Sequence, residues 1–330
     1  MTAFRVGITK PIHPAATKLL QDAGLAVLQA DEGQPIADLV GHVEALVSHL
    51  TDRIDDALLS QGTELRLVAN VAAGYDNVDI AAAQRRGITV TNTPGVLTEA
   101  TADLAIALML AVARRIPESD AQLRSEKSVN WRLLPDSMGL DVTKQTLGVV
   151  GMGQIGLAVA QRAIGGFGMT VLYSGGSGPA AATAREIGCR EVSLPTLLAE
   201  SDFISLHVPL TDGTHHLIDA AALRAMKPEA VLINTARGAV IDEQALVEAL
   251  REGLIGGAGL DVYEREPAVT TGLLDLRERV VITPHIGSAT SATRRQMSMM
   301  AVRNVLAVAD NREAITPITA ARAAGKDVLR

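Results

Sequence analysis

Three side chains with complementary chemistry stand in the second half of the chain. Arg237, Glu266 and His285 each come a few residues after a short apolar segment that is typical of a buried strand. A planar guanidinium binds a carboxylate through two parallel hydrogen bonds. A histidine beside a carboxylate forms an acid–base pair, because the carboxylate stabilises the imidazolium and keeps a proton available near neutral pH. These residue types predict a site that binds a small carboxylate and transfers a proton.

Reduction of a 2-oxo acid needs, besides a hydride, the groups that these three residues supply. A cation binds the carboxylate and polarises the carbonyl group, an acid protonates the forming alkoxide, and a partner orients that acid. Taken one at a time, the residues have simpler interpretations: an arginine that caps a helix, a solvated acid and a hydrogen-bonded histidine at a strand end. Their occurrence together, each after a predicted strand of the same half of the chain, favours a catalytic set.

A glycine-rich turn, G-M-G-Q-I-G at residues 151–156, follows the apolar segment 147–150 and opens a predicted helix. Gly151 suits a tight turn, Gly153 allows the backbone to approach a pyrophosphate, and Gly156 allows helix and strand to pack closely. The free N–H groups at the start of the helix bind the anion. The glycine spacing alone is weak evidence, but its position between a strand and a helix predicts dinucleotide binding.

The loop after the next strand bears on which dinucleotide is bound. An NAD site usually places an acidic residue there to bind the ribose 2′-hydroxyl, whereas the sequence S-G-G-S-G at 174–178 contains none. The missing carboxylate removes a repulsion toward a 2′-phosphate, although the loop also lacks the arginine that commonly binds that phosphate. We therefore expect NADP(H) to be favoured, with Ser174 and Ser177 as ligands, and NAD(H) still to be accepted.

Apolar β-rich segments alternate with helical patterns along most of the chain, which is typical of parallel sheets covered by helices. The first 98 residues contain one such series of flavodoxin-like type, and a second series of six strands begins at Thr146, as in a doubly wound dinucleotide domain. The helix 291–309 is expected to return the chain to the first domain. The prediction is an α/β protein with two doubly wound parallel-sheet domains and a cleft between them: a discontinuous substrate domain at 1–98 plus 291–330, and a Rossmann domain at 99–290.

The composition argues against several classes of protein. A net charge of −7 provides no positive field for nucleic acid or an anionic membrane. The longest apolar run, 104–113, is about half the length of a membrane span, and no secretory signal is visible. A single cysteine, Cys189, allows no intrachain disulfide, and the adjacent His215 and His216 have no further metal ligands beside them. We expect a soluble, cytoplasmic protein without a metal site.

Several ordered motifs resemble the D-isomer-specific 2-hydroxyacid dehydrogenase family. They include A-G-Y-D-N-V-D at 73–79, the helix at 100–115, the glycine turn and the segments around the arginine, glutamate and histidine described above. The segments T-P-G-V-L-T at 93–98 and P-H-I-G-S-A-T at 284–290 look most like the glyoxylate/hydroxypyruvate reductase branch. The resemblance covers nearly the whole chain. It implies two flavodoxin-like domains that close on a cleft, usually in a homodimer held by the dinucleotide domains.

The resemblance also implies roles for individual residues. Arg237 would anchor the substrate, His285 would be the acid–base group and Glu266 would pair with it. The substrate-binding positions would be Leu50, the N–H groups of Ala73 and Gly74, and Arg237. The cofactor-contacting positions that the resemblance implies are Thr101, Gln154, Ile155, Val208, Pro209, Thr235, Ala236 and Asp261. The full set of expected cofactor contacts also includes Gly151, Gly153, Gly156, Ser174, Ser177, Arg237, His285 and Gly287.

The reaction implied is NAD(P)H-dependent reduction of glyoxylate or hydroxypyruvate to glycolate or D-glycerate, and the sequence does not rank these two substrates. Phosphite oxidation uses a similar set of residues and stays an alternative, as do other D-2-hydroxyacid dehydrogenases. Formate oxidation is disfavoured, because that branch resembles a Gln–His pairing where this chain has Glu266. A dinucleotide-sensing scaffold without catalysis is the other class, although the expected partner-binding extensions are missing. Trp131 could reach a neighbouring subunit's pocket or simply pack in an interface.

Overall fold

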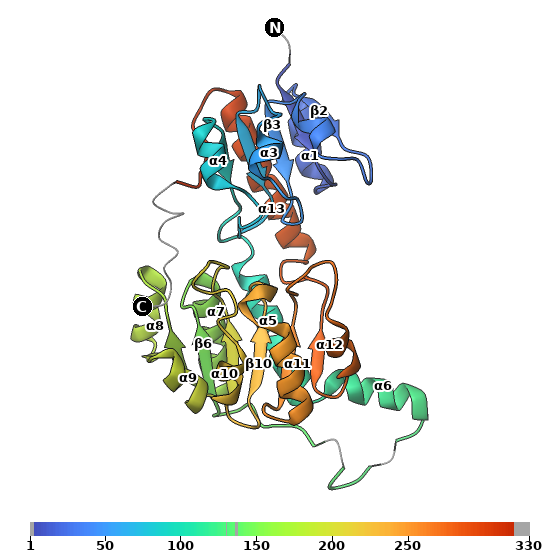
Figure 1. Ribbon diagram of the computed structural model, residues 1–330, viewed down its shortest axis with the longest axis vertical. Helices are drawn as coiled ribbons and strands as arrows, with labels where there is room; N and C mark the ends of the chain where they lie inside the picture. Colours follow the sequence, from blue (N-terminus) through green and yellow to red (C-terminus); the bar gives the residue numbers. More distant parts are fainter. Residues whose placement is uncertain (1–2, 130, 136–137, 320–330) are drawn as a thin grey trace. The chain divides into compact units, whose positions relative to one another are not determined.

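The computed structural model describes residues 3–129, 131–135 and 138–319 and divides into two compact units, each built on a parallel sheet (Figure 1). The first unit consists of the chain up to Leu97 together with the described chain from Ser288 onwards, and the second consists of Thr98–Gly287. The chain therefore leaves the first unit once and returns to it once. Residues 320–330, which were predicted to belong to the first domain, lie outside the described residues.

The first unit contains a five-stranded parallel sheet of order β2-β1-β3-β4-β5, which is the flavodoxin-like order expected from the sequence. Side chains alternate between its faces: Val47 packs in the apolar cluster of Met297 on one face, and Leu46 packs in the cluster of Leu59 on the other. The strands are β1 (Arg5–Ile8), β2 (Ala26–Gln29), β3 (Ala45–Ser48), β4 (Leu67–Asn70) and β5 (Thr89–Thr91). The helices are α1 (Pro14–Asp22), α2 (Ala37–Val40), α3 (Asp56–Leu59), α4 (Ile80–Arg85) and α13 (Ser291–Ala309).

The second unit contains a seven-stranded parallel sheet of order β12-β11-β10-β9-β6-β7-β8. The strands are β6 (Thr146–Val150), β7 (Thr170–Ser174), β8 (Arg190–Glu191), β9 (Phe203–Leu206), β10 (Val231–Asn234), β11 (Gly257–Leu260) and β12 (Val280–Ile282). The helices are α5 (Thr98–Ala113), α6 (Ile116–Glu126), α7 (Gln154–Phe167), α8 (Pro179–Glu186), α9 (Leu194–Glu200), α10 (Ala220–Arg224), α11 (Glu243–Glu252) and α12 (Thr271–Asp275), with the 3-10 helix η1 (Gly238–Val240).

The central strands of the second unit are apolar throughout because both faces of this sheet are covered. Ile233 packs with Leu108 of α5 on one face, whereas Leu232 packs with Leu246 of α11 on the other. The strand order reverses between β6 and β9, which is the position where doubly wound sheets bind their ligands. The predicted fold class is confirmed. The six predicted strands are joined by β8, whose two exposed residues are too few to give a sequence pattern.

One close backbone approach fixes the segments that follow β10 and β11. Gly238 begins η1 and lies directly against the peptide group between Tyr263 and Glu264. A Cβ atom added to Gly238 would overlap the Tyr263 carbonyl group and the Glu264 nitrogen. Backbone atoms cannot withdraw as a flexible side chain can, so that only glycine fits at this position.

We expect Gly238→Ala to lower the free energy of unfolding by about 3 kcal/mol, the upper end of the usual cost of overpacking. The reason is that the added methyl group would overlap backbone atoms of Tyr263 and Glu264. The matched control is Gly166→Ala in α7, where the added Cβ meets open space. The higher helix propensity of alanine should raise the free energy of unfolding of this variant by about 0.5–1 kcal/mol. Urea unfolding of both variants checks the prediction. A Gly238→Ala protein with the wild-type midpoint would contradict the close approach.

Candidate active site

The carboxyl ends of three adjacent strands carry the predicted chemical residues. Arg237 follows β10, Glu266 follows β11 and His285 follows β12, and these strands are parallel neighbours in the sheet. Parallel strands end at one edge, which is where an open α/β sheet forms its ligand site. The structure brings Glu266 and His285 into direct contact, with Nδ1 of His285 2.9 Å from Oε2 of Glu266. Because Nδ1 faces the carboxylate, Nε2 is the ring nitrogen positioned to exchange a proton with a ligand.

The carboxylate of Glu266 is engaged through both oxygens. Oε2 faces His285, and Oε1 accepts a hydrogen bond of 3.0 Å from the N–H of Tyr263. Burial acts to raise the pKa of Glu266, but the hydrogen bonds from His285 and Tyr263 and the nearby charge of Arg237 outweigh it and hold the pKa below its ordinary value. Glu266 is therefore ionised throughout the neutral pH range, as a partner for an imidazolium must be.

The backbone at His285 is held by a buried carboxylate. Asp261 is 1% exposed, and its side chain accepts the N–H groups of Ile286 and Gly287, both at 2.7 Å, and the hydroxyl of Thr283 at 2.6 Å. The N–H of His285 also donates to the Asp261 carbonyl at 2.9 Å. These bonds form a tight turn in which His285 adopts a left-handed conformation, with φ of 53°. The turn aims the imidazole toward Glu266.

Arg237 extends from a turn that Asn234 shapes. The Asn234 side chain is fully buried, accepts the N–H of Ala236 at 3.0 Å and donates to the carbonyl of Arg237 at 2.9 Å. Nη1 of Arg237 donates to the Ala236 carbonyl at 2.8 Å. A guanidinium offers five N–H donors in a planar fork, which is the geometry that binds a carboxylate through two parallel hydrogen bonds.

The glycine turn joins β6 to α7, and two of its glycines are required by packing. A Cβ on Gly151, where φ is 95°, would lie 2.7 Å from the His207 carbonyl oxygen, and one on Gly156 would overlap the Gly151 carbonyl. Gly153 differs, because an added Cβ there meets no atom within 4 Å. The chain leaves the space beside Gly153 open, as a turn that admits a pyrophosphate requires. The residues present therefore fit a dinucleotide.

The loop after β7 packs directly on the glycine turn. The carbonyls of Ser174 and Gly175 accept the N–H groups of Gly151 and Met152 at 2.9 and 2.8 Å, and a Cβ on Gly176 would press on Met152. Ser174 is 6% exposed, whereas Ser177 is exposed on the loop. This packing brings Ser174 beside the turn, and Ser177 follows Gly176 on the same loop, which contains no carboxylate.

An arginine that the sequence pattern did not single out follows this loop on α8. Arg185 donates to the hydroxyl of Tyr173 at 3.2 Å and to the carboxylate of Glu191 at 3.1 Å. Tyr173 in turn donates to Glu191 at 3.0 Å. The arginine and the glutamate compensate each other near the end of β7, so neither contributes a net charge to the loop.

The other predicted cofactor positions lie at the carboxyl edge of the same sheet or on α5. Thr101 of α5 donates to the Gly287 carbonyl at 3.3 Å, which ties α5 to the turn after His285. Val208 and Pro209 follow β9, and Thr235 follows β10. The Thr235 hydroxyl is buried and has no hydrogen-bond partner among the described residues, so a bound ligand could satisfy it. Gln154 and Ile155 begin α7, and Ala236 follows Thr235.

The predicted substrate residues of the first unit follow two adjacent strands of its sheet. Leu50 comes after β3, and Ala73 and Gly74 come after β4. Asn77 joins the two loops, because its side-chain nitrogen donates to the carbonyls of His49 and Asp52 at 3.0 and 2.9 Å. One polar network therefore holds both segments at the carboxyl edge of the first unit.

A buried glutamate that the sequence pattern does not distinguish supports the segment of Glu266. Glu243 is 3% exposed, and its carboxylate accepts the N–H of Glu264 at 2.7 Å and the hydroxyl of Thr270. In the sequence Glu243 has only the signal of an acidic residue in the first turn of a helix. Its contacts across more than 20 residues of chain could not be read from that signal.

Three other histidines are accounted for by local contacts. His207 is half-buried beside Ser205, with Nε2 2.8 Å from the hydroxyl, and desolvation lowers the pKa of His207 to about 4, so it is neutral. The rings of His215 and His216 stack at 4.0 Å, and His216 lies 3.3 Å from Glu264. Within residues 3–129, 131–135 and 138–319 there is no group of three or more His, Cys, Asp or Glu side chains suited to a metal ion. In the same residues no helix has the length and apolar character of a membrane span.

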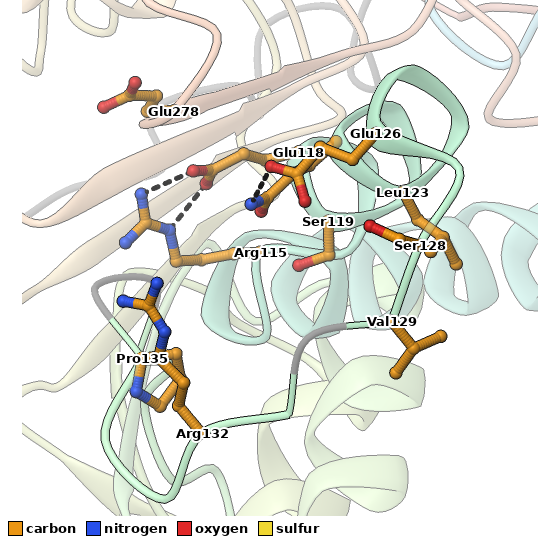
Figure 2. Close-up of a pocket in the computed structure, with 11 residues that line it drawn as sticks. Arg115, Glu118, Ser119, Leu123, Glu126, Ser128, Val129, Arg132, Pro135 and Glu278 are labelled. Carbon is orange, nitrogen blue, oxygen red and sulfur yellow. Dashed lines mark hydrogen bonds and ion pairs between the residues drawn. The ribbon is translucent and has the colours of Figure 1, made fainter.

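A surface pocket of about 730 Å³ lies apart from all of these residues, between α6, residues 128–135 and Glu278 (Figure 2). Arg115 and Glu118 form a bidentate ion pair in its wall, at 2.6 and 2.8 Å. None of the predicted site residues lines this pocket. Its polar wall and its separation from the glycine turn make it a poor candidate for the site of hydride transfer.

Known proteins resemble the chain over almost its whole length. It is 48% identical to glyoxylate reductase of Thermococcus litoralis over 313 residues, which covers 92% of this chain and 93% of that protein. It is 45% identical to glyoxylate reductase of Aeropyrum pernix over 318 residues, with 93% of each covered.

Solved structures share the fold. The TT0316 protein of Thermus thermophilus superposes with a TM-score of 0.88 at 44% identity, covering 96% of this chain and all of that one. An NADPH-dependent glyoxylate/hydroxypyruvate reductase from Sinorhizobium meliloti, in complex with NADP and malonate, superposes with a TM-score of 0.84 at 33% identity and covers 100% and 99% of the two chains.

A family model extends over more than half of the chain. Residues 106–287 match the model described as "D-isomer specific 2-hydroxyacid dehydrogenase, NAD binding domain". The second unit is thus the part that binds a nicotinamide dinucleotide. With these similarities and the strand-end geometry together, the chain belongs to the D-isomer-specific 2-hydroxyacid dehydrogenase family and is an oxidoreductase that acts on CH–OH groups.

Proposed function

We propose that this enzyme uses NAD(P)H to reduce a small 2-oxo acid, glyoxylate or hydroxypyruvate, to glycolate or D-glycerate. The observation that carries the proposal is the pair of His285 and Glu266, 2.9 Å apart, on the sheet edge that also carries Arg237 and the glycine turn. The glyoxylate reductases of Thermococcus litoralis and Aeropyrum pernix, at 48% and 45% identity, support this substrate class.

The three residues divide the chemistry between them. Arg237 binds the substrate carboxylate and polarises the neighbouring carbonyl group. Nε2 of His285 donates a proton to the carbonyl oxygen as that oxygen becomes an alkoxide, and Glu266 stabilises the imidazolium before the transfer. Bound NAD(P)H supplies the hydride that forms the new C–H bond. After the step His285 is neutral and takes up a proton from solvent.

The first unit is proposed to contribute the N–H groups of Ala73 and Gly74 as ligands of the substrate carboxylate, with Leu50 lining the pocket. No hydrogen bond of the described chain uses either of these two N–H groups, which supports the assignment. Hydrogen bonds from N–H groups to a carboxylate are charge-assisted and are stronger than those to a neutral acceptor.

The cofactor is proposed to be NADP(H) by preference, with NAD(H) accepted. The loop at 174–178 carries Ser174 against the glycine turn, Ser177 three residues further on and no carboxylate, so nothing in this loop repels a 2′-phosphate. The open space beside Gly153 and the unpaired hydroxyl of Thr235 support the path of the dinucleotide. The Sinorhizobium meliloti enzyme, which is NADPH-dependent, supports the preference.

The enzyme is further proposed to act as a cytoplasmic homodimer formed by the second unit. Figure 1 shows α6 and the segment after it extending away from the helix and sheet layers of this unit. Val129, Trp131, Leu133 and Leu134 in that segment are between 76% and 85% exposed, which is unusual for a run of large apolar side chains on a monomer. A second copy of the chain is the partner that we propose to cover these side chains.

A substrate panel tests the proposed function. We expect NADPH-dependent turnover of glyoxylate and hydroxypyruvate with kcat/KM on the order of 10⁴ M⁻¹s⁻¹ or more, and weaker turnover of pyruvate. His285→Ala should lose about 10²-fold in kcat while still binding NADPH, because only the proton donor is removed. Turnover of phosphite alone would identify the alternative dehydrogenase. Tight cofactor binding without turnover of any compound would favour a sensor.

The cofactor preference is tested by kcat/KM for NADPH and NADH at a saturating concentration of glyoxylate. We expect NADPH to be favoured, because the loop at 174–178 has hydroxyl groups and no acid. Ser177→Asp places a carboxylate on this exposed loop and should reverse the preference by repelling the 2′-phosphate. A wild-type enzyme that clearly prefers NADH would show that the missing acid is not the deciding feature.

A further inference from the structure

We propose that Asn92 is a positioning residue that orients the N–H of Gly74 toward the substrate carboxylate. The inference rests on the proposed function, in which the N–H groups of Ala73 and Gly74 bind that carboxylate. Asn92 directly follows β5, and its side-chain nitrogen donates to the carbonyl of Ala73 at 2.7 Å.

The geometry of the peptide bond turns this contact into an orientation. In a trans peptide the C=O of one residue and the N–H of the next point in opposite directions. The N–H of Gly74 belongs to the same peptide group as the carbonyl of Ala73. A donor that holds the carbonyl on one side therefore directs the N–H of Gly74 to the other side.

The peptide groups on either side are held in the same way. The carbonyl of Ala72 accepts the backbone N–H of Thr93 at 2.8 Å, which directs the N–H of Ala73 away from β5. The carbonyl of Gly74 accepts the side-chain nitrogen of Asn70 at 3.1 Å. Three consecutive carbonyl groups are thus occupied by donors from the protein, and the two N–H groups assigned to the substrate stay unused within the described chain.

The burial of Asn92 indicates that its donor is needed in this place. The residue is 3% exposed, and its side-chain oxygen is buried without a hydrogen-bond partner among the described residues. An unpaired buried acceptor is unfavourable, and a smaller or apolar side chain would avoid it. The amide nitrogen is the part of the side chain that makes a contact, and that contact is with the substrate loop.

The position of Asn92 is itself fixed from the returning part of the chain. Its backbone carbonyl accepts the hydroxyl of Thr316 at 2.7 Å, and Thr316 is bound by Asn304 of α13 at 3.0 Å. Asn304 is fully buried and also accepts the N–H groups of Ile315 and Thr316. The asparagine therefore stands on a rigid support, which a residue that sets a binding geometry requires.

The test compares two variants of Asn92 with a control. Asn92→Asp keeps the shape but replaces the donor with an acceptor that repels the Ala73 carbonyl, and Asn92→Leu removes the donor without burying a charge. Ser298→Ala in α13 is the matched control, because it removes buried hydrogen bonds of the first unit, with the N–H of His13 and the carbonyl of Arg294, and leaves Asn92, its support and the contact with Ala73 in place. Thermal unfolding identifies the variants that fold.

Two readouts separate positioning from general stability. The first readout compares the change in the KM for glyoxylate with the changes in kcat and in the KM for NADPH. The second readout is the affinity of the enzyme–NADPH complex for oxamate, measured by calorimetry. We expect each folded Asn92 variant to raise the glyoxylate KM and the oxamate Kd about tenfold, as for a lost bond to a charged group. The KM for NADPH should stay within about twofold, and Ser298→Ala should lower only the unfolding temperature.

The outcomes distinguish this inference from the function on which it rests. A wild-type enzyme that reduces no 2-oxo acid overturns both. Wild-type turnover combined with unchanged oxamate affinity in Asn92→Leu overturns the positioning role alone. An equal loss of oxamate affinity in Ser298→Ala also overturns it, because the effect would then follow from stability rather than from the donor to Ala73.

Discussion

The carboxylate of Asp261 is the interaction on which the site of the second unit depends. This carboxylate is buried at the end of β11 and accepts hydrogen bonds from the N–H groups of Ile286 and Gly287 and from the hydroxyl of Thr283. The left-handed backbone of His285 costs about 1–2 kcal/mol, whereas hydrogen bonds to a charged acceptor contribute about 1.5–3 kcal/mol each. The free energy of these hydrogen bonds outweighs the cost of the left-handed backbone. The imidazole is therefore held toward Glu266 before any substrate binds.

The opposite side of the pair is held by separate contacts. The segment that carries Glu266 lies against Gly238, where no side chain fits, and the buried carboxylate of Glu243 accepts the N–H of Glu264. Tyr263 donates its N–H to Glu266 directly. Preorganisation of this kind matters because a donor or an acid that is already in place does not have to reorganise during the reaction. The first unit follows the same principle, with buried amides holding the carbonyl groups of its substrate loop.

Much of the fold could be predicted from the sequence because the strong signals are local. The alternation of apolar strands and helices indicated both parallel sheets, and the glycine turn was recognisable from its place between β6 and α7. Arg237, Glu266 and His285 could be grouped without coordinates, since parallel strands all end at one edge. The pairing of Glu266 with His285 was expected from the resemblance to the D-isomer-specific 2-hydroxyacid dehydrogenase family, and in the structure the two side chains lie 2.9 Å apart. β8 escaped prediction because two residues carry no periodicity.

The supporting residues could not be predicted, for a physical reason. Asn92, Glu243 and Gly238 act through contacts with residues 19 to 27 positions away in the chain, and those contacts depend on loop conformations that no periodicity encodes. In the sequence Asn92 is one polar residue after a strand. Asp261 was singled out only as a cofactor position, and its role in shaping the turn of His285 became visible through the three donors that its buried carboxylate accepts.

We propose that Glu266 stabilises the imidazolium form of His285 that donates the proton, and the pH dependence of kcat/KM for glyoxylate reduction in wild type and Glu266→Gln tests this central claim most directly. Because hydrogen bonds hold the pKa of Glu266 below its ordinary value, the carboxylate is charged from the acid range upward and loses its charge only as the pH falls through that lowered pKa. In wild type its negative charge is therefore present beside His285 over the whole neutral range. Glutamine keeps the shape and removes the charge, so the alkaline limb of reduction should move to lower pH by roughly one unit. An alkaline limb that stays in place would contradict the account.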